Sequence, residues 1–78
     1  MTNANTAPKT SDTLRQWRFA HANAKRAAAE RQALPVGADP AVATERANES
    51  VKWAEECEWL YSLLTPDDAV TADREASR

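Results

Sequence analysis

The sequence is poor in the residues on which most compact functional sites depend. Among its 78 residues it has one cysteine, one histidine and one glycine. A single cysteine excludes an internal disulfide framework and a cysteine-based zinc site, and a single glycine excludes a glycine-rich phosphate loop. One histidine argues against a histidine-rich metal site, and the acidic residues do not have the spacing of paired catalytic carboxylates. We therefore expect a protein that is not an enzyme and that needs no metal or cofactor.

Large apolar side chains are scarce as well. The hydrophobic fraction is 42%, but alanine supplies most of it and buries little area per residue. No apolar run approaches the roughly 20 residues that span a bilayer, and the chain starts with no signal-peptide pattern. A chain of this length buries only about 60% of its unfolded surface. These features predict a soluble, cytoplasmic protein without a membrane partner, which gains core area by assembling as a homo-oligomer.

The charge is distributed unevenly along the chain. Residues 1–34 carry six basic and two acidic residues, a net charge of +4, whereas residues 35–78 carry four basic and ten acidic ones, a net charge of −6. Two explanations stay open: the halves attract each other, or the basic half binds an anion. The pI near 5.3 and the small number of cations argue against a nucleic acid as that anion.

Helix signals divide the chain into an arm, two long helices and a tail. Capping-box spacing at residues 13–16 places the first helix start near residue 12, and the cluster of Pro and Gly at 34–40 predicts a turn. The fold class is therefore all-α, an antiparallel two-helix hairpin with helices at about 12–34 and 40–64. The predicted boundaries are 1–10 for an extended arm, 11–65 for the hairpin and 66–78 for the tail.

Two cap-then-Pro signals mark further helix starts. Asp39 followed by Pro40 is an N-cap with proline at the first helical position. Thr65 followed by Pro66 repeats this signal, so the last residues form either a short helix over 67–75 or a polar tail. We favour the tail, because terminal polar segments are commonly frayed.

The first helix carries an apolar stripe and a neighbouring basic stripe at helical spacing. Phe19 lies outside the apolar stripe, beside Arg15 and Arg26. Two interpretations of Phe19 stay open: it packs in a subunit interface, or it is a stacking platform for a base between phosphate-binding cations. The apolar stripe is Leu14, Trp17, Ala20, His21, Ala24, Ala27 and Ala28, and the basic stripe contains Arg15, Arg18, Lys25 and Arg26.

The second helix is apolar over a wider arc. Because residues 59–64 are apolar almost all the way round, we expect a subunit interface there. Cys57 has no histidine nearby in the sequence and is expected to act as a small buried hydrophobe. The predicted inward stripe is Ala43, Ala47, Val51, Ala54, Cys57, Tyr61 and Leu64, widened by Trp53, Leu60 and Leu63. The predicted oligomer interface is Trp53, Trp59, Leu60 and Leu63.

Several positions resemble the pattern of a known family. Ala7-Pro8-Lys9 stands in the arm, Trp17 and Ala24-Lys25 stand in the first helix, and Pro35 stands at the turn. The second helix contains Glu49-Ser50-Val51-Lys52-Trp53-Ala54. On these positions, over about residues 6–64, the chain resembles the phage anti-CBASS sponge family, whose helical-hairpin domain is shared with an anti-Thoeris sponge. It departs from that pattern at Thr6, His21 and Glu55.

The resemblance implies a homo-oligomer, a hexamer or another multiple of dimers, in the cytoplasm of a phage-infected bacterium. It would bind a cyclic di- or trinucleotide or a related small nucleotide between protomers without cleaving it, and so block anti-phage signalling. A different nucleotide is an alternative, given the departures. Charge, spacing and the resemblance select as ligand-binding residues Pro8, Lys9, Trp17, Arg18, His21, Lys25 and Arg26, with Phe19 as the candidate stacking residue.

The role of His21 stays open. His21 shares a helix face with Trp17 and Lys25, so it is either a structural histidine or, with Lys25, a phosphate ligand.

The ridge from Trp59 to Leu64 predicts, as an alternative function, a small helical inhibitor or adaptor that docks on a host protein.

Overall fold

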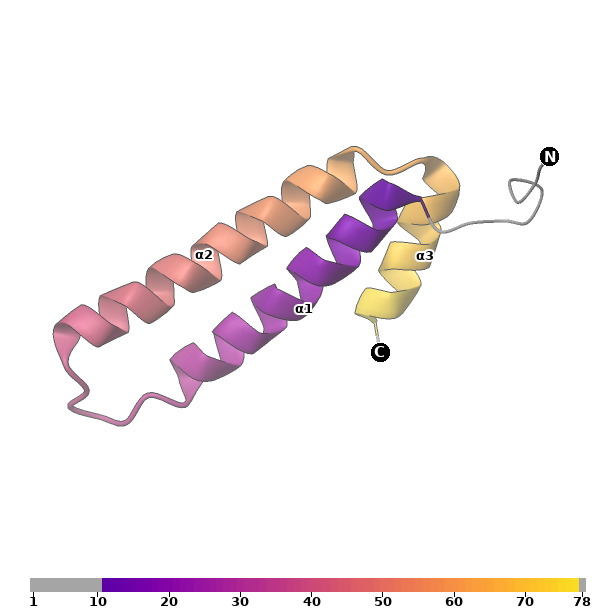
Figure 1. Cartoon of the computed structure of the whole chain (residues 1–78). Helices are drawn as coiled ribbons and strands as arrows, with labels where there is room; N and C mark the ends of the chain where they lie inside the picture. The colour runs from indigo at the N-terminus through magenta and orange to yellow at the C-terminus, as the bar shows by residue number, and fades with distance from the viewer. Residues whose placement is uncertain (1–10, 78) are drawn as a thin grey trace.

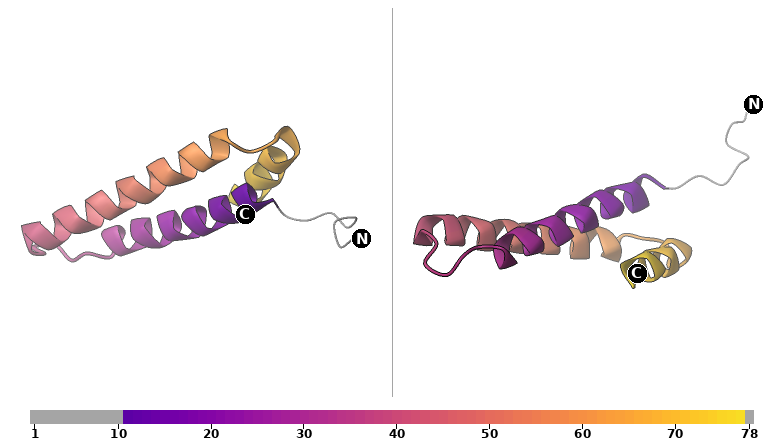
Figure 2. Two further views of the ribbon diagram at one scale, coloured as in Figure 1. Left: turned by 45° about the horizontal axis from the view of Figure 1, so that its top comes forward. Right: turned by 90° about the horizontal axis from the view of Figure 1, so that it is seen from below.

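The computed structural model describes residues 11–77, and within that range the chain forms three α-helices and no strands. They are α1 (Asp12–Gln32), α2 (Pro40–Ser62) and α3 (Pro66–Ala76). The helices α1 and α2 lie side by side and run in opposite directions, and α3 folds back across the end of the pair where α1 begins (Figures 1 and 2). The all-α prediction is confirmed, and the predicted arm, with Pro8 and Lys9, lies outside the described residues.

Each helix begins with a side chain that accepts a hydrogen bond from the first turn. The Ser11 hydroxyl accepts from the Leu14 amide at 3.0 Å, the Asp39 carboxylate from the Ala41 amide at 2.8 Å, and the Thr65 hydroxyl from the Asp68 amide at 3.2 Å. Such caps satisfy amides that have no partner within the helix. The predicted capping box at 13–16 is therefore wrong: Ser11 is the cap, and the box residues lie inside α1.

The two long helices end about two residues earlier than predicted. The Leu34 amide turns away to donate to the Arg31 carbonyl at 3.3 Å, because the residue before a proline is disfavoured in helical conformation and Pro35 follows. The loop then requires Gly37, whose φ of 87° lies in the left-handed region.

The C-terminal segment is a helix, so our preference for a polar tail is wrong. The cap at Thr65 and two acidic residues in the first turn stabilise the start of α3. The Ser11 hydroxyl donates to the Asp68 carboxylate at 2.7 Å, and Ala72 is completely buried. Tertiary contacts of this kind order a polar segment that helix propensity alone would leave frayed.

The core is small and lies where all three helices meet. It consists of Leu14, Trp17, Ala20, Leu60 and Ala72, with Trp53, Cys57 and Leu64 packed against it and half-buried. The predicted apolar stripe of α1 is confirmed, since all its members are buried or half-buried.

The observed inward face of α2 agrees with only part of the predicted stripe and is rotated away from the rest of it. Val51 and Tyr61 were expected inside, but they are 50% and 38% exposed. Cys57 and Leu64 face the core as predicted, and so do Trp53 and Leu60, which were expected to widen the stripe. The reason is steric: the alanines of α1 leave room that large side chains fill better than alanine or valine does.

This rotation also corrects the predicted oligomer interface. Leu60 is 3% exposed and belongs to the chain's own core, and Trp53 packs against that core. Trp59 and Leu63 remain 57% and 54% exposed. Only these two of the four proposed interface residues therefore present a large apolar surface outward.

Candidate functional site: two grooves on opposite sides of the helix pair

Ion pairs within the chain account for much of the uneven charge distribution. Arg18 of α1 pairs with Glu75 of α3 at 2.6 Å. Further along, Arg26 pairs with Glu49 of α2 at 3.5 Å, and Arg46 of α2 lies 3.8 Å from Glu30 of α1. The basic first half and the acidic second half therefore attract each other, one of the two explanations left open by the sequence.

The contact between Arg18 and Glu75 is bidentate. The Arg18 Nε atom donates to Oε1 and Oε2 of Glu75 at 2.9 and 3.1 Å, and Nη2 donates to Oε2 at 2.6 Å. This fork geometry is the arrangement with which arginine also binds phosphate. Hydrogen bonding to Glu75 raises the pKa of Arg18. A ligand phosphate at Arg18 would have to replace the Glu75 carboxylate.

Arg26 is held on a different side of α1. Its guanidinium donates to Glu30 at 3.0 Å and to the Asn23 side-chain oxygen at 3.0 Å, in addition to the Glu49 contact. The hydrogen bond to Glu30 is the main cause of its raised pKa. Arg26 is therefore engaged in a network that joins α1 to α2.

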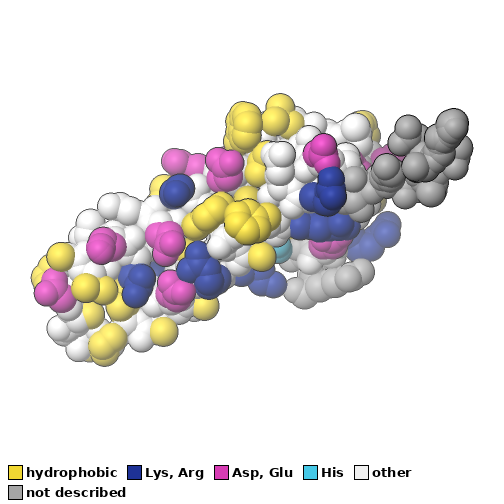
Figure 3. Space-filling view, in the orientation of Figure 1, with side chains coloured by type: hydrophobic (Ala, Val, Ile, Leu, Met, Phe, Trp, Pro, Cys, Tyr) yellow, Lys and Arg dark blue, Asp and Glu magenta, His cyan; other side chains and the backbone are white. Residues whose placement is uncertain are grey.

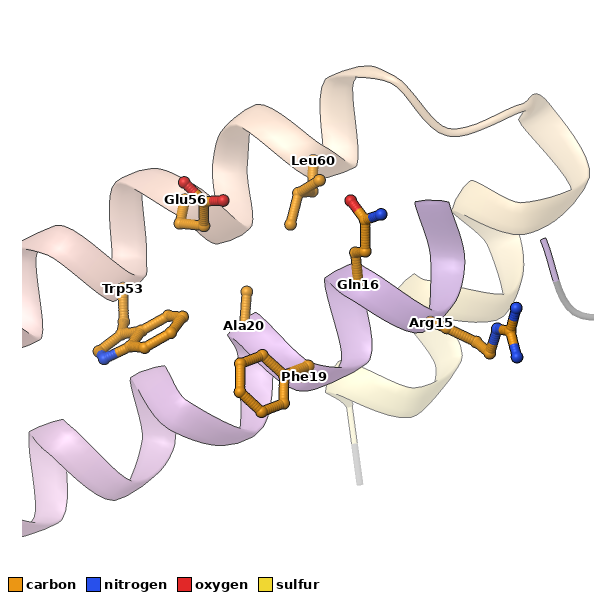
Figure 4. Close-up of a pocket in the computed structure, with 7 residues that line it drawn as sticks. All are labelled: Arg15, Gln16, Phe19, Ala20, Trp53, Glu56 and Leu60. Atoms are coloured by element: carbon orange, nitrogen blue, oxygen red, sulfur yellow. The ribbon is translucent and has the colours of Figure 1, made fainter. Parts of the chain in front are cut away.

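One groove lies on the side of the helix pair that faces the viewer in Figure 4, and we call it the Phe19 groove. Its volume is about 430 Å³. The Phe19 and Trp53 rings meet edge to face across it, with centroids 5.7 Å apart and planes at 79°. Its lining residues are Arg15, Gln16, Phe19, Ala20, Trp53, Glu56 and Leu60.

The other groove, of about 350 Å³, shares no lining residue with the first, and we call it the His21 groove. The His21 ring is stacked on the Trp17 ring, with centroids 4.7 Å apart and planes at 11°. Trp17 thus supports one face of the imidazole. All three helices contribute to the His21 groove. The residues that line it are Trp17, His21, Ala24, Ala54, Cys57, Glu58, Tyr61, Asp73 and Ala76.

Two titratable groups in the His21 groove keep their protons at neutral pH. The Tyr61 hydroxyl donates to the Asp73 carboxylate at 2.8 Å, and this hydrogen bond raises the pKa of Tyr61. Burial raises the pKa of Cys57, with the nearby Glu58 charge adding to the effect and a hydrogen bond with Trp17 opposing it. A protonated thiol is a weak nucleophile, consistent with the expectation that Cys57 is a small hydrophobe.

The structure separates the predicted ligand residues into two groups. Trp17 and His21 line the His21 groove, and Arg18 and Lys25 of the basic stripe lie within one helical turn of His21. Phe19, in contrast, lines the other groove, and Arg26 contacts Glu30 and Glu49. Glu55, the acidic departure from the family pattern, is exposed on α2 and lines neither groove.

Sequence reasoning missed the residues that α3 contributes. Asp73, Glu75 and Ala76 complete the His21 groove or pair with Arg18. A signal was present, since Thr65 followed by Pro66 is a helix start, and a third helix of a small chain must pack on the other two to be stable.

The fold and its grooves define a small all-α protein with surface sites between helices. No protein-family model, curated protein or solved structure matches this chain. The resemblance to the sponge family therefore stays a prediction, and the ligand has to be inferred from the chemistry of the grooves. Within residues 11–77, no helix is both long and apolar enough to cross a membrane, and no cluster of three His, Cys, Asp or Glu side chains could hold a metal ion.

Proposed function

We propose that this chain is a non-catalytic, homo-oligomeric protein of helical hairpins that binds a small nucleotide in the His21 groove and withholds it from solution. The observation that carries the proposal is the convergence of four predicted ligand residues on one side of α1. Trp17 and His21 form the stacked ring pair, and Arg18 and Lys25 are the cations beside it.

The groove suits the two parts of a nucleotide. A base can stack on the outer face of His21, since planar rings favour offset stacking. Lys25 is exposed one helical turn from His21 and can meet a phosphate, as can Arg18 once Glu75 has been displaced. Carboxylates at the groove, Glu58 and Asp73, accept hydrogen bonds from an exocyclic amino group. This donor and acceptor pattern favours an amino-bearing base.

The proposed consequence is depletion of a signal. In line with the resemblance, the ligand class is a cyclic di- or trinucleotide second messenger, or a related nucleotide, in the cytoplasm of a bacterial host. The Cys57 thiol, which lines the groove, keeps its proton. Binding without cleavage then leaves the ligand intact but unavailable to its effector.

Isothermal titration calorimetry with cyclic dinucleotides, cyclic trinucleotides and ADP-ribose-type signals tests the proposal. We expect saturable binding, and recovery of intact ligand after heat denaturation of the protein. Lys25→Ala should weaken binding severalfold. Arg26→Ala is the matched control, because it removes a cation that Glu30 and Glu49 already engage, and it should leave the affinity unchanged. No binding across the panel, or an equal loss in both variants, would overturn the proposed site.

A second candidate function rests on one observation. Trp59 and Leu63 share a face of α2 and are both more than half exposed. Docking on a host protein through this ridge would leave the His21 groove without a role. This second function predicts that a defined host protein copurifies with the chain and no longer copurifies with the variant Trp59→Glu. Nucleotide binding should be the same in both.

A further inference from the structure

The Phe19 groove lies within a larger apolar surface that spans α1 and α2. Phe19 is 64% exposed although its ring contacts Trp53. On α2, Glu56, Trp59 and Leu63 follow one another at spacings of three and four, so they share a helix face. Glu56 also lines the groove. The exposed Trp59–Leu63 ridge is therefore continuous with the groove, and Figure 3 shows hydrophobic side chains gathered on this side of the molecule.

Charges of opposite sign lie on the two helices that form this surface. Arg15 lines the groove from α1, and Glu56 lines it from α2. Arg15 also pairs with Asp12 one turn earlier, but both side chains are largely exposed. Exposed pairs of this kind are weak, so Arg15 can engage another carboxylate. The surface thus carries a basic edge and an acidic edge with aromatic rings between them.

We propose that a second copy of this chain packs on this surface about a two-fold axis parallel to α1 and α2. Such an axis lays α1 of each copy on α2 of the other and yields an antiparallel four-helix bundle. This rotation puts α1 of one copy opposite α2 of the other, and every residue keeps its position along the direction of the axis. Arg15 of one copy then lies opposite Glu56 of the other, and Phe19 enters the groove beside Trp53 of the second copy.

The self-complementary charge pattern is what selects a second copy as the occupant. An isologous interface places one patch against the same patch, so a uniformly charged patch would repel itself. Here the basic edge meets the acidic edge twice, once on each side of the axis. The contact also covers Phe19, Trp59 and Leu63, each more than half exposed in the single chain, and exposed apolar surface of this kind commonly marks an interface. The inference rests only on the oligomeric part of the proposed function.

Reversal of the two charges gives a direct test. Arg15→Glu places like charges opposite each other in a dimer, and so does Glu56→Arg. Each purified variant should sediment near the monomer mass of 8.6 kDa, while the wild type has an even multiple of that mass. An equimolar mixture of the two variants should regain the wild-type mass, because both Arg–Glu contacts are restored in the heterodimer. Glu55→Arg is the matched control, since Glu55 is exposed on α2 and lines neither groove, and it should keep the wild-type mass.

Circular dichroism on each variant confirms that the helices are intact. A monomeric wild type, dimeric single variants or a mixture that stays monomeric would each overturn the inference. Titration of the same samples with a cyclic dinucleotide separates this failure from that of the proposed function. A wild-type monomer that binds the nucleotide overturns the dimer surface and the oligomeric part of the proposed function but not the His21 groove. A dimer that binds none of the nucleotides overturns only the His21 groove.

Discussion

Leu60 is the side chain whose removal should destabilise this fold most clearly. It is almost fully buried and belongs to the core cluster, to which all three helices contribute. Leu60→Ala removes about three methylene equivalents, which at about 0.8 kcal/mol each cost roughly 2.4 kcal/mol. Buried Leu→Ala substitutions span about 2–5 kcal/mol, with the larger values where a sealed cavity remains. Because Leu60 also lines the open Phe19 groove, water can enter the vacated space, and we expect about 2–3 kcal/mol.

Urea denaturation followed by circular dichroism at 222 nm measures this loss. A domain of this length has a free energy of unfolding on the order of 4–12 kcal/mol, so a change of this size is easily resolved. Leu63→Ala is the matched control on the same helix, with roughly half of the side chain already exposed. It should cost less than about 1 kcal/mol at low protein concentration. A loss below about 1 kcal/mol for Leu60→Ala, or equal losses for both, would refute the assignment of Leu60 to the chain's own core.

Three further outcomes follow from the groups around the His21 groove. Glu75→Gln should speed amide hydrogen exchange in α3, because the bidentate contact with Arg18 is weakened, and it should tighten nucleotide binding; unchanged exchange would contradict the role of this contact. Because the folded-state pKa of Tyr61 lies above its ordinary value, the stabilising contact with Asp73 is fully present below about pH 10 and is lost as the pH rises through that raised pKa. Hydrogen exchange in α3 measures the loss of this contact at alkaline pH. In Tyr61→Phe this dependence on pH should disappear. Cys57 should react with iodoacetamide severalfold more slowly than glutathione at pH 8, since burial raises its pKa; equal rates would show that the thiol is exposed.

The positions of α1 and α2 could be predicted to within about two residues because their signals are local. A cap and a following proline identify the start of α2, and the proline at position 35 ends α1. The apolar stripe of α1 was also predictable, since most of its members are alanines and Leu14 and Trp17 are the only large aliphatic or aromatic side chains on it. Local chemistry of this kind does not depend on where the other helices lie.

The face of α2 could not be predicted in the same way. Apolar residues surround most of this helix, so periodicity allows several rotations, and the choice depends on which side chains fill the space beside the alanines of α1. Trp53 and Leu60 fill it in the structure, which turns Val51 and Tyr61 outward. For the same reason, the sequence could not show that the predicted site is divided between two grooves. Phe19 and His21 are only two positions apart in the sequence, and they line different grooves because α2 packs between them.

The pairing of charges within the chain also constrains the size of any anionic ligand. A polyanion such as duplex DNA is bound by many cations at once, and each phosphate contact contributes to a steep dependence on salt. On α1, Arg18 and Arg26 are already engaged with Glu75, Glu30 and Glu49. Lys25 and an exchangeable Arg18 are the cations left beside the His21 groove. Two such cations match the one or two phosphates of a small nucleotide, whereas an extended nucleic acid would meet mostly carboxylates on α2 and α3. The electrostatics therefore favour a small ligand over a polymer.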